Sequence, residues 1–189
     1  PAHTSPYQFF QHFMQTDDRQ VSEYLAKFTL LPLDAVDAVA ADHASQPERR
    51  AGQRRLAEEV TRLVHGPDAM AAAAEATDVL FGASPLAAGA DALAVVAEEV
   101  PTAPLPSAAE LAVGVDVVPL LVEADLAASK GAARRSLEQG AVSVNGERVG
   151  PGAAVGAGAV LHGRYVLLRK GKRSYALLVA ENSAGREQT

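Results

Sequence analysis

Residues 129–149 have the sequence SKGAARRSLEQGAVSVNGERV, and this stretch decides the fold predicted around it. Ser129 is a suitable helix N-cap, good helix formers follow it, and Gly140 stands where a helix would end. Two valines then alternate with a serine, as in a half-buried strand, before the turn pair Asn145-Gly146. The stretch therefore predicts a helix, a strand and a tight hairpin in that order.

The start of this helix has the features of a phosphate-binding site. Lys130 and Arg134 are four residues apart and share one face, beside the free amides of the first turn. A helix N-terminus attracts anions through these amides and its dipole, and Gly131 leaves room for a backbone to approach. The alternative is an ordinary capped helix with solvated basic residues, and the stretch alone leaves both interpretations open.

The charge of the surrounding sequence favours the phosphate-binding interpretation. Residues 130–173 include nine basic and two acidic residues, a net charge of +7 in a chain whose total is −6. Such asymmetry is typical of a polyanion partner, which we predict to be RNA. Together with Gly131, the predicted RNA-binding residues are Lys130, Arg134, Arg135, Arg148, Arg164, Arg169, Lys170, Lys172 and Arg173.

The two halves of the 189-residue chain differ in charge and predict two domains. Residues 1–104 have 7 Lys and Arg against 15 Asp and Glu, whereas residues 105–189 have 10 against 8. Between them, the segment PTAPLP at 101–106 cannot continue a helix and favours an extended, semi-rigid connector. We therefore expect a helical domain over residues 1–104 and a basic module over residues 105–189.

The first half predicts an acidic, all-helical bundle. The segment SPYQFF at 5–10 combines an N-cap serine with a proline at the first helical position. Its aromatic residues favour a buried helix over one that stacks on RNA bases. Further helices are expected to start near Asp17, Pro32 and Pro47, and to cover residues 67–81 and 91–100.

The second half predicts a small α/β-hairpin module, so the fold class of the chain is α+β. A short helix is expected over residues 107–111 and a longer one over 117–126. The glycine-rich residues 150–158 predict a flexible loop or an irregular edge. Strands at 164–168 and 174–179 are expected to flank the charged turn RKGKR at 169–173, and the polar tail at 181–189 is expected to be disordered.

No stretch of the sequence has the pattern of an active site. The chain has no cysteine, which excludes disulfides and thiolate metal sites, and its five histidines lack metal-ligand spacing. We expect the histidines to be solvated or to cap helices. There is no phosphate-cradle motif, no apolar run of about 18 residues and no signal peptide. We therefore expect a soluble cytoplasmic protein without catalytic residues, bound metal, cofactor or membrane contact.

Several motifs occur in the order known from one enzyme family: SPYQFFQ, TDDRQV, LAEEVTRLVHG, SKGAARRSLEQGAVSVNGERV and YVLLRKGKRSYALL. In this order they resemble the C-terminal half of bacterial tyrosyl-tRNA synthetase, over residues 5–179. The resemblance implies a helical anticodon-binding domain followed by a small basic module of the kind named after the fourth small-subunit ribosomal protein. Together these domains would hold tRNA-Tyr at its anticodon stem and long variable arm.

The resemblance also implies a catalytic domain that is not part of this chain. In the family, a Rossmann-type domain upstream binds ATP and tyrosine, and its H-x-G-H and K-M-S-K-S signatures do not occur here. We therefore expect this chain to be a fragment without cofactors of its own, whose partners are tRNA-Tyr and the missing catalytic domain. The full-length enzyme is expected to be a homodimer and the fragment a monomer.

Asp18 is the residue that the resemblance connects with anticodon reading, because Gln20 stands where the family is often acidic. A carboxylate there would accept hydrogen bonds from a guanine of the anticodon. The simpler interpretation is that Asp17 and Asp18 favour a helix start through its dipole, an effect of about 0.3 to 1 kcal/mol.

Two other functions stay open from the sequence. A free-standing ribosome- or RNA-associated factor would begin with methionine in the genomic reading frame and would have no ligase domain upstream. In the other alternative, the acidic helical half is a protein-interaction domain and the basic half is incidental. A pull-down that recovers protein but no RNA would favour this last function.

We expect the isolated chain neither to activate tyrosine with ATP nor to charge tRNA, because its sequence has no nucleotide cradle and no acid–base set. The measurement is tyrosine-dependent exchange between pyrophosphate and ATP with the purified chain. Exchange above the background of a sample without tyrosine would contradict the prediction.

Overall fold

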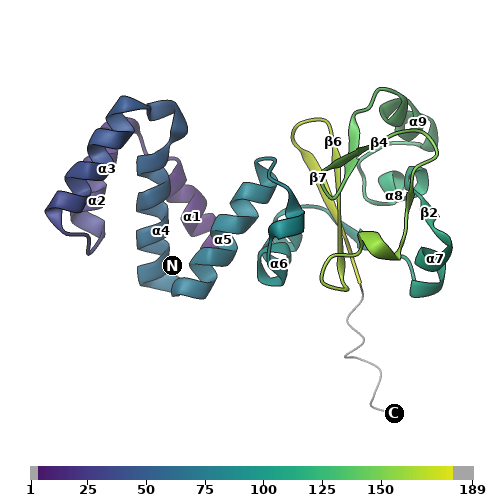
Figure 1. Ribbon diagram of the computed structural model, residues 1–189, viewed down its shortest axis with the longest axis horizontal. Coiled ribbons are helices and arrows are strands. Elements are labelled where there is room, and N and C mark those ends of the chain that lie inside the picture. Colours follow the sequence, from purple (N-terminus) through teal and green to yellow (C-terminus); the bar gives the residue numbers. More distant parts are fainter. Residues whose placement is uncertain (1–3, 181–189) are drawn as a thin grey trace, which may run out of the picture. The chain divides into compact units, whose positions relative to one another are not determined.

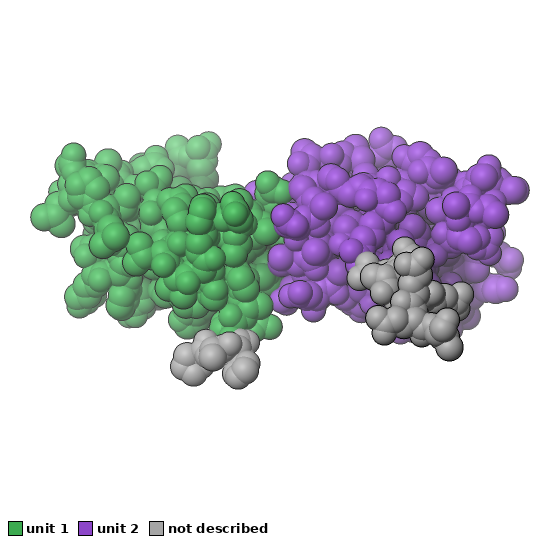
Figure 2. Space-filling view, turned by 90° about the horizontal axis from the view of Figure 1, so that it is seen from below, with its two compact units in different colours: residues 1–77 green, residues 78–189 purple. Residues whose placement is uncertain are grey.

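The computed structural model describes residues 4–180 of the chain. The tail at 181–189, which the sequence predicts to be disordered, lies outside the described residues. The chain divides into two compact units, Pro1–Thr77 and Asp78–Thr189, which Figure 2 shows in different colours. Each unit has an apolar core of its own.

The first unit is helical, as the spacing of its apolar residues predicts. Ser5 caps the first helix, because its Oγ accepts a hydrogen bond of 3.1 Å from the Gln8 amide. Pro6 stands at the first helical position, where its missing N–H removes no helical hydrogen bond. The elements are α1 (Pro6–Met14), η1 (Asp18–Gln20), α2 (Val21–Phe28), α3 (Leu33–Ser45), η2 (Pro47–Arg49), α4 (Ala51–His65) and α5 (Pro67–Leu80), whose last residues reach into the second unit.

The core of the first unit forms where α1, α2 and α3 pack against α4. Phe10 of α1 is completely buried in a cluster with Ala57 of α4, which confirms the packing role predicted for the aromatic helix. His43 is also buried, at 6% exposure, although the sequence predicts solvated histidines. The ring packs closely against α4 at Gly52, where a Cβ atom would lie 2.9 Å from Cγ of His43. The neighbouring apolar cluster consists of Val21, Leu25, Val36, Leu56 and Val60.

The second unit is built on a five-stranded sheet (Figure 1). The strand order is β1-β7-β6-β3-β4, with β1 parallel to β7 and all other pairs antiparallel. A separate antiparallel pair joins β2 to β5. The elements are η3 (Pro85–Ala87), α6 (Ala90–Glu99), β1 (Thr102–Pro104), α7 (Ala108–Val113), β2 (Val115–Asp116), α8 (Val117–Glu123), α9 (Lys130–Glu138), β3 (Val142–Val144), β4 (Glu147–Val149), β5 (Ala154–Val155), η4 (Ala157–Ala159), β6 (Tyr165–Lys170) and β7 (Ser174–Val179).

Both faces of this sheet are covered along β6 and β7. On one face, Val166 of β6 packs in a core with Leu121 of α8 and Leu137 of α9. Successive residues of a strand point to opposite faces, so Leu167 lies on the other face, where it is also buried. Helix α6 contacts the neighbouring strand β7. The α+β fold class predicted from the sequence is confirmed.

Pairing at the sheet edge changes the predicted role of the proline segment at 101–106. Strand β1 pairs with β7, and the Leu177 N–H donates to the Pro101 carbonyl at 3.0 Å. The segment is therefore part of the sheet and not a free connector. The boundary between the compact units accordingly falls between Thr77 and Asp78, whereas the charge pattern predicts it at 104/105.

Two other local predictions also differ from the structure. Residues 154–155, within the segment predicted as a flexible loop or an irregular edge, form strand β5 and pair with β2. Arg169 and Lys170, predicted in a charged turn, belong to strand β6, which stays paired as far as Lys170. In each case, the hydrogen-bonding partner is distant in the sequence.

Replacing Gly52 with alanine should destabilise the first unit. A Cβ atom at this position would lie 2.7 Å from Cγ1 of Val21 and 2.9 Å from Cγ of His43. Overpacking of this kind costs about 1 to 3 kcal/mol, which exceeds the gain of up to about 1 kcal/mol from removing a glycine within a helix. The measurement is urea unfolding followed by circular dichroism.

Gly158→Ala is the matched control for this prediction. A Cβ atom at Gly158 would meet no other atom within 4 Å, so this variant should unfold at nearly the same urea concentration as the wild type. A Gly52→Ala variant as stable as this control would contradict the predicted close contact between α3 and α4.

Candidate nucleic-acid interface

Helix α9 presents its basic residues to solvent and its apolar residues to the core. It begins where the sequence predicts, because Ser129 Oγ accepts a hydrogen bond of 3.2 Å from the Ala132 amide. Ala133 and Leu137 are buried in the core of the second unit. The predicted RNA-binding residues of this element are all exposed: Lys130, Gly131, Arg134 and Arg135.

Asn145 holds the hairpin between β3 and β4 in place. Asn145 and Gly146 both have positive φ, 49° and 87°, as a type I′ turn requires. The buried Asn145 side chain donates from Nδ2 to the Ala159 carbonyl at 2.6 Å, and its Oδ1 accepts from the Leu167 N–H at 2.9 Å. These bonds tie the turn to η4 and β6, and so position the strand that carries the exposed Arg148.

The predicted basic residues around the β6–β7 turn divide into two pairs. Arg169 and Lys170 belong to β6 and are only partly exposed. The Arg169 guanidinium lies 5.9 Å from the centre of the Tyr175 ring, and Lys170 Nζ donates to the Leu126 carbonyl. The two residues that remain fully exposed in the turn are Lys172 and Arg173.

Arg164 lies apart from the other predicted site residues. It precedes β6, so the length of this strand, at about 3.3 Å per residue, separates it from the β6–β7 turn. Its guanidinium lies 5.6 Å from the centre of the Tyr165 ring, and the residue is partly buried. The structure therefore does not bring Arg164 together with Arg169.

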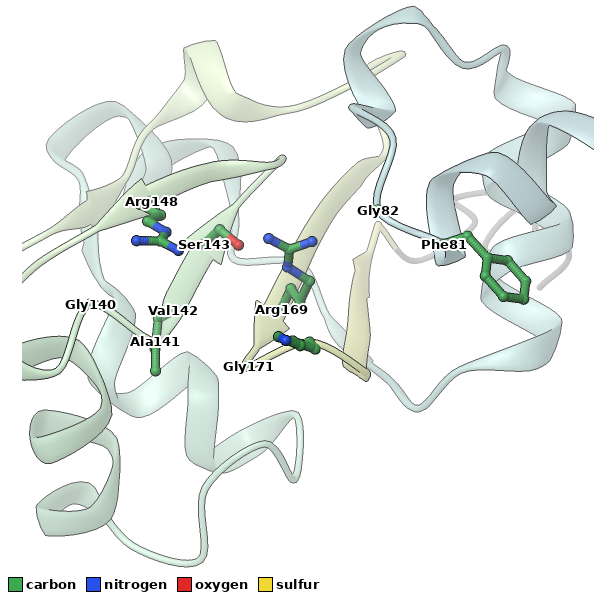
Figure 3. Close-up of a pocket in the computed structure, with 10 residues that line it drawn as sticks. Phe81, Gly82, Gly140, Ala141, Val142, Ser143, Arg148, Arg169 and Gly171 are labelled. Carbon is green, nitrogen blue, oxygen red and sulfur yellow. The ribbon is translucent and has the colours of Figure 1, made fainter. Parts of the chain in front are cut away.

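Three of the predicted residues meet at one cavity (Figure 3). Arg148 of β4, Arg169 of β6 and Lys172 of the turn line a space of about 370 Å³. Its uncharged lining includes Ser143, which reasoning from the sequence did not select. Strand alternation could have indicated Ser143, because it places this residue on the sheet face opposite the valines of β3. The other lining residues are Phe81, Gly82, Gly140, Ala141, Val142 and Gly171.

The basic residues of the second unit are not neutralised by acidic neighbours. Within residues 4–180, no acidic side chain forms an ion pair with a basic residue of the 130–173 stretch. On α4 of the first unit, by contrast, Arg55 and Arg62 both pair with Glu59, at 2.9 and 3.1 Å. The unpaired cations leave a positive surface that can attract a polyanion.

Asp18 is held in position, but it is not the residue that caps the helix start. The cap is Asp17, whose Oδ1 accepts a hydrogen bond of 3.0 Å from the Arg19 amide. Asp18 Oδ1 accepts from Gln53 Nε2 at 2.5 Å and lies 3.3 Å from Nε2 of His43. The Asp18 side chain is 62% exposed beside a cavity of about 440 Å³. Asp17 therefore caps the helix start and Asp18 stands in its first turn, so the dipole interpretation applies to both, while Asp18 is also accessible.

Two other features of functional sites do not occur within residues 4–180. No helix in this part of the chain is long and apolar enough to cross a membrane. No group of three or more His, Asp or Glu side chains there is arranged to hold a metal ion.

Replacing Asn145 with alanine should destabilise the second unit. The change leaves the partly buried Ala159 carbonyl and the buried Leu167 N–H without their side-chain partner and places alanine at a positive φ. Lost partners of this kind cost about 1 to 3 kcal/mol each, so the expected loss is about 2 to 6 kcal/mol. The measurement is the free energy of unfolding in urea.

Asn145→Asp is a graded control for this prediction. Aspartate tolerates positive φ and can still accept from the Leu167 N–H, but it cannot donate to the Ala159 carbonyl. Its stability should fall between those of the wild type and Asn145→Ala. An alanine variant with wild-type stability would show that the turn does not depend on this side chain.

Comparison with known proteins gives two family matches that together cover most of the chain. Residues 93–178 match the model described as tyrosine–tRNA ligase SYY-like C-terminal domain. Residues 1–82 match the model described as tRNA synthetases class I (W and Y). The two matches therefore concern different parts of the chain and name the same class of enzyme.

Individual relatives agree with these matches. A tyrosine–tRNA ligase of Anaeromyxobacter dehalogenans (strain 2CP-C) is 49% identical over 94% of this chain and 42% of its own length. The ligase of Opitutus terrae is 40% identical over the same shares. A solved C-terminally truncated mitochondrial tyrosyl-tRNA synthetase of Aspergillus nidulans is 34% identical, covers 42% of this chain and 24% of its own, and has a TM-score of 0.41. The chain thus spans 42% of the length of the curated relatives, and it belongs to the tyrosine–tRNA ligase family, matching the C-terminal part of these enzymes.

Proposed function

We propose that this chain is the tRNA-binding part of a tyrosine–tRNA ligase, and that it binds tRNA-Tyr at the anticodon stem and long variable arm. The observation that carries the proposal is the unpaired basic surface of the second unit, which lies in the segment that matches the ligase C-terminal domain. The relatives are tyrosine–tRNA ligases, which supports tyrosine tRNA as the partner. They give no support to a free-standing RNA-associated factor.

Phosphate contacts at the start of α9 are the first element of this binding. Lys130, Arg134 and Arg135 are exposed on the nine-residue helix, with Lys130 as its first residue and Arg135 in its last turn. The free amides and the dipole of a helix N-terminus add to the attraction for phosphate. Lys172 and Arg173 of the β6–β7 turn supply further exposed charge. Contacts of this kind set affinity and orientation but read no base sequence.

A base-reading contact is proposed for Asp18 of the first unit. Its carboxylate can accept hydrogen bonds from the Watson–Crick edge of an unstacked guanine in the anticodon loop. Gln53 of α4 donates a hydrogen bond to one of its oxygens, and Nε2 of His43 lies 3.3 Å from the same oxygen, so the group is oriented before RNA arrives. The exposure of the Asp18 side chain supports this role, because a base can reach it.

The chemistry of charging is assigned to the rest of the ligase. ATP and tyrosine would bind a catalytic domain beyond the matched part, and this chain would need no cofactor of its own. Its partners would then be tRNA-Tyr and that domain, in a cytoplasmic enzyme that is a homodimer at full length, whereas the isolated chain is a monomer. The 42% share of the relatives' length leaves room for such a domain.

The purified chain should bind tRNA-Tyr less tightly as salt rises, and changing Lys130, Arg134 and Arg135 together to alanine should weaken this salt dependence. Each phosphate contact contributes about 0.7 to 0.9 to the slope of log affinity against log salt, so the slope should decrease by about 2 to 3. The fold should survive, because Ala133 and Leu137 still pack in the core. Fluorescence anisotropy of labelled tRNA over a salt series measures the slope, and circular dichroism checks the fold.

Arg55→Ala combined with Arg62→Ala is the control for lost positive charge. Both arginines are already paired with Glu59, so the double variant should keep a slope close to that of the wild type. A folded triple variant with unchanged affinity and slope would show that α9 has only a structural role. A wild-type chain that binds no tRNA-Tyr at low salt would overturn the proposed function itself.

A further inference from the structure

A row of four polar side chains crosses the sheet of the second unit. The register pairs Arg148 of β4 with Ser143 of β3, Ser143 with Arg169 of β6, and Arg169 with Tyr175 of β7. Residues paired directly across neighbouring strands point to the same face, so all four lie opposite the face that carries Val142 into the core. Figure 3 shows the guanidinium groups of the two arginines and the serine hydroxyl around one open space.

Two groups in this row lack the partners that buried polar groups normally have. Nε of Arg169 and the hydroxyl of Tyr175 are buried without a hydrogen bond. Ser143 is only 2% exposed, and no group within residues 4–180 forms a hydrogen bond with its hydroxyl. Most buried polar groups in proteins are satisfied, so the unsatisfied Nε of Arg169, a residue that lines the cavity, points to a missing ligand.

The cavity beside this row is positively charged. Its charged lining consists of Arg148, Arg169 and Lys172, and no acidic residue lines it. Small residues form much of the remaining wall, which leaves the backbone open to a ligand: Gly82, Gly140, Ala141 and Gly171. The Phe81 ring points away from the arginines in Figure 3 and does not fill the space.

We propose that this cavity binds one phosphate group of the RNA, together with part of the nucleotide that carries it. Arg148 and Arg169 approach from two strands and would donate N–H groups to the phosphate oxygens, for which the planar guanidinium is well suited. The Ser143 hydroxyl donates from the floor between them, and Lys172 adds charge from the turn. The identification of the ligand as RNA rests on the proposed function.

The size of the cavity favours a nucleotide over an isolated small anion. A space of about 370 Å³ exceeds what a phosphate group alone occupies and lies in the range of about 300 to 1,000 Å³ that is typical of small-molecule sites. The uncharged wall at Gly140 and Ala141 leaves room for a ribose or a base. This contact is separate from the exposed cations of α9, none of which lines the cavity.

Ser143→Ala is the sharpest test, because its effects on binding and on stability should separate. The change removes a hydroxyl that has no partner within the protein, so the stability of the chain should stay the same or rise. The affinity for tRNA-Tyr should nevertheless fall by about three- to tenfold, because one hydrogen bond to phosphate is lost. A serine with a purely structural role would lower stability instead and leave the affinity unchanged.

Lys172→Ala and Arg173→Ala form a matched pair. Both residues are exposed in the same turn and both changes remove one positive charge, but only Lys172 lines the cavity. Lys172→Ala should weaken tRNA binding several-fold more than Arg173→Ala. Arg148→Ala, at an exposed position on the other side of Ser143, should weaken binding by about tenfold or more.

Amide resonances of the cavity wall report on the ligand directly. The ¹⁵N-labelled full chain is titrated with inorganic phosphate, with 5′-AMP and with tRNA-Tyr, and the peaks of Gly140, Ala141 and Gly171 are followed. We expect these peaks to move with 5′-AMP and with tRNA-Tyr, and to move less in Ser143→Ala. Peaks that respond to inorganic phosphate or 5′-AMP but not to tRNA would identify a small-anion site and overturn the proposal.

The binding data separate failure of this inference from failure of the proposed function. If the wild-type chain binds tRNA-Tyr and the Ser143, Arg148 and Lys172 variants bind it equally well, the cavity is not part of the interface and the function stands. If the wild-type chain does not bind tRNA-Tyr, both are overturned. Reduced binding by all three variants without loss of stability in Ser143→Ala supports the phosphate site.

Discussion

The register between β3 and β6 is the constraint on which the basic surface of the second unit depends. Asn145 holds this register, because its buried side chain bonds both the Leu167 N–H and the Ala159 carbonyl while its own N–H bonds the Leu167 carbonyl. A shift of one residue would turn Ser143 toward the core and the neighbouring valines toward the cavity. The packing of apolar residues therefore determines where the charged side chains of this sheet lie.

The two units use positive charge differently. On α4 of the first unit, arginines pair with glutamates of the same helix, so their charges largely cancel. In the second unit, the cations of α9 and of the β6–β7 turn have no acidic partner among the described residues, and the net charge of residues 130–173 is +7. A chain with an overall charge of −6 thus keeps one strongly positive region. Because long-range attraction depends on local charge, this region can bind a polyanion although the whole chain is acidic.

The cavity beside Ser143 combines incomplete packing with a buried polar group that has no partner. Buried polar groups without partners lower stability, and folded proteins keep such groups mainly at functional sites. A bound phosphate would satisfy Nε of Arg169 and neutralise the charge of Arg148 and Arg169 at the same time. The contact would also link RNA binding to the sheet itself, because the two arginines come from strands on either side of β3.

Local sequence patterns were enough to predict the helices and the Asn-Gly hairpin. They were also enough to show the resemblance to the ligases. The Ser129 cap, the buried stripe of α9 and the turn at Asn145 depend on residues within a few positions of one another, so their signals can be read along the chain. Only the tertiary structure decided that β1 pairs with β7, that His43 is buried, and that Arg169 leaves the turn to face Ser143 while Arg164 stays apart. These outcomes come from strand pairing and helix packing between distant residues, and the pattern around each residue contains no information about a partner that lies far along the chain.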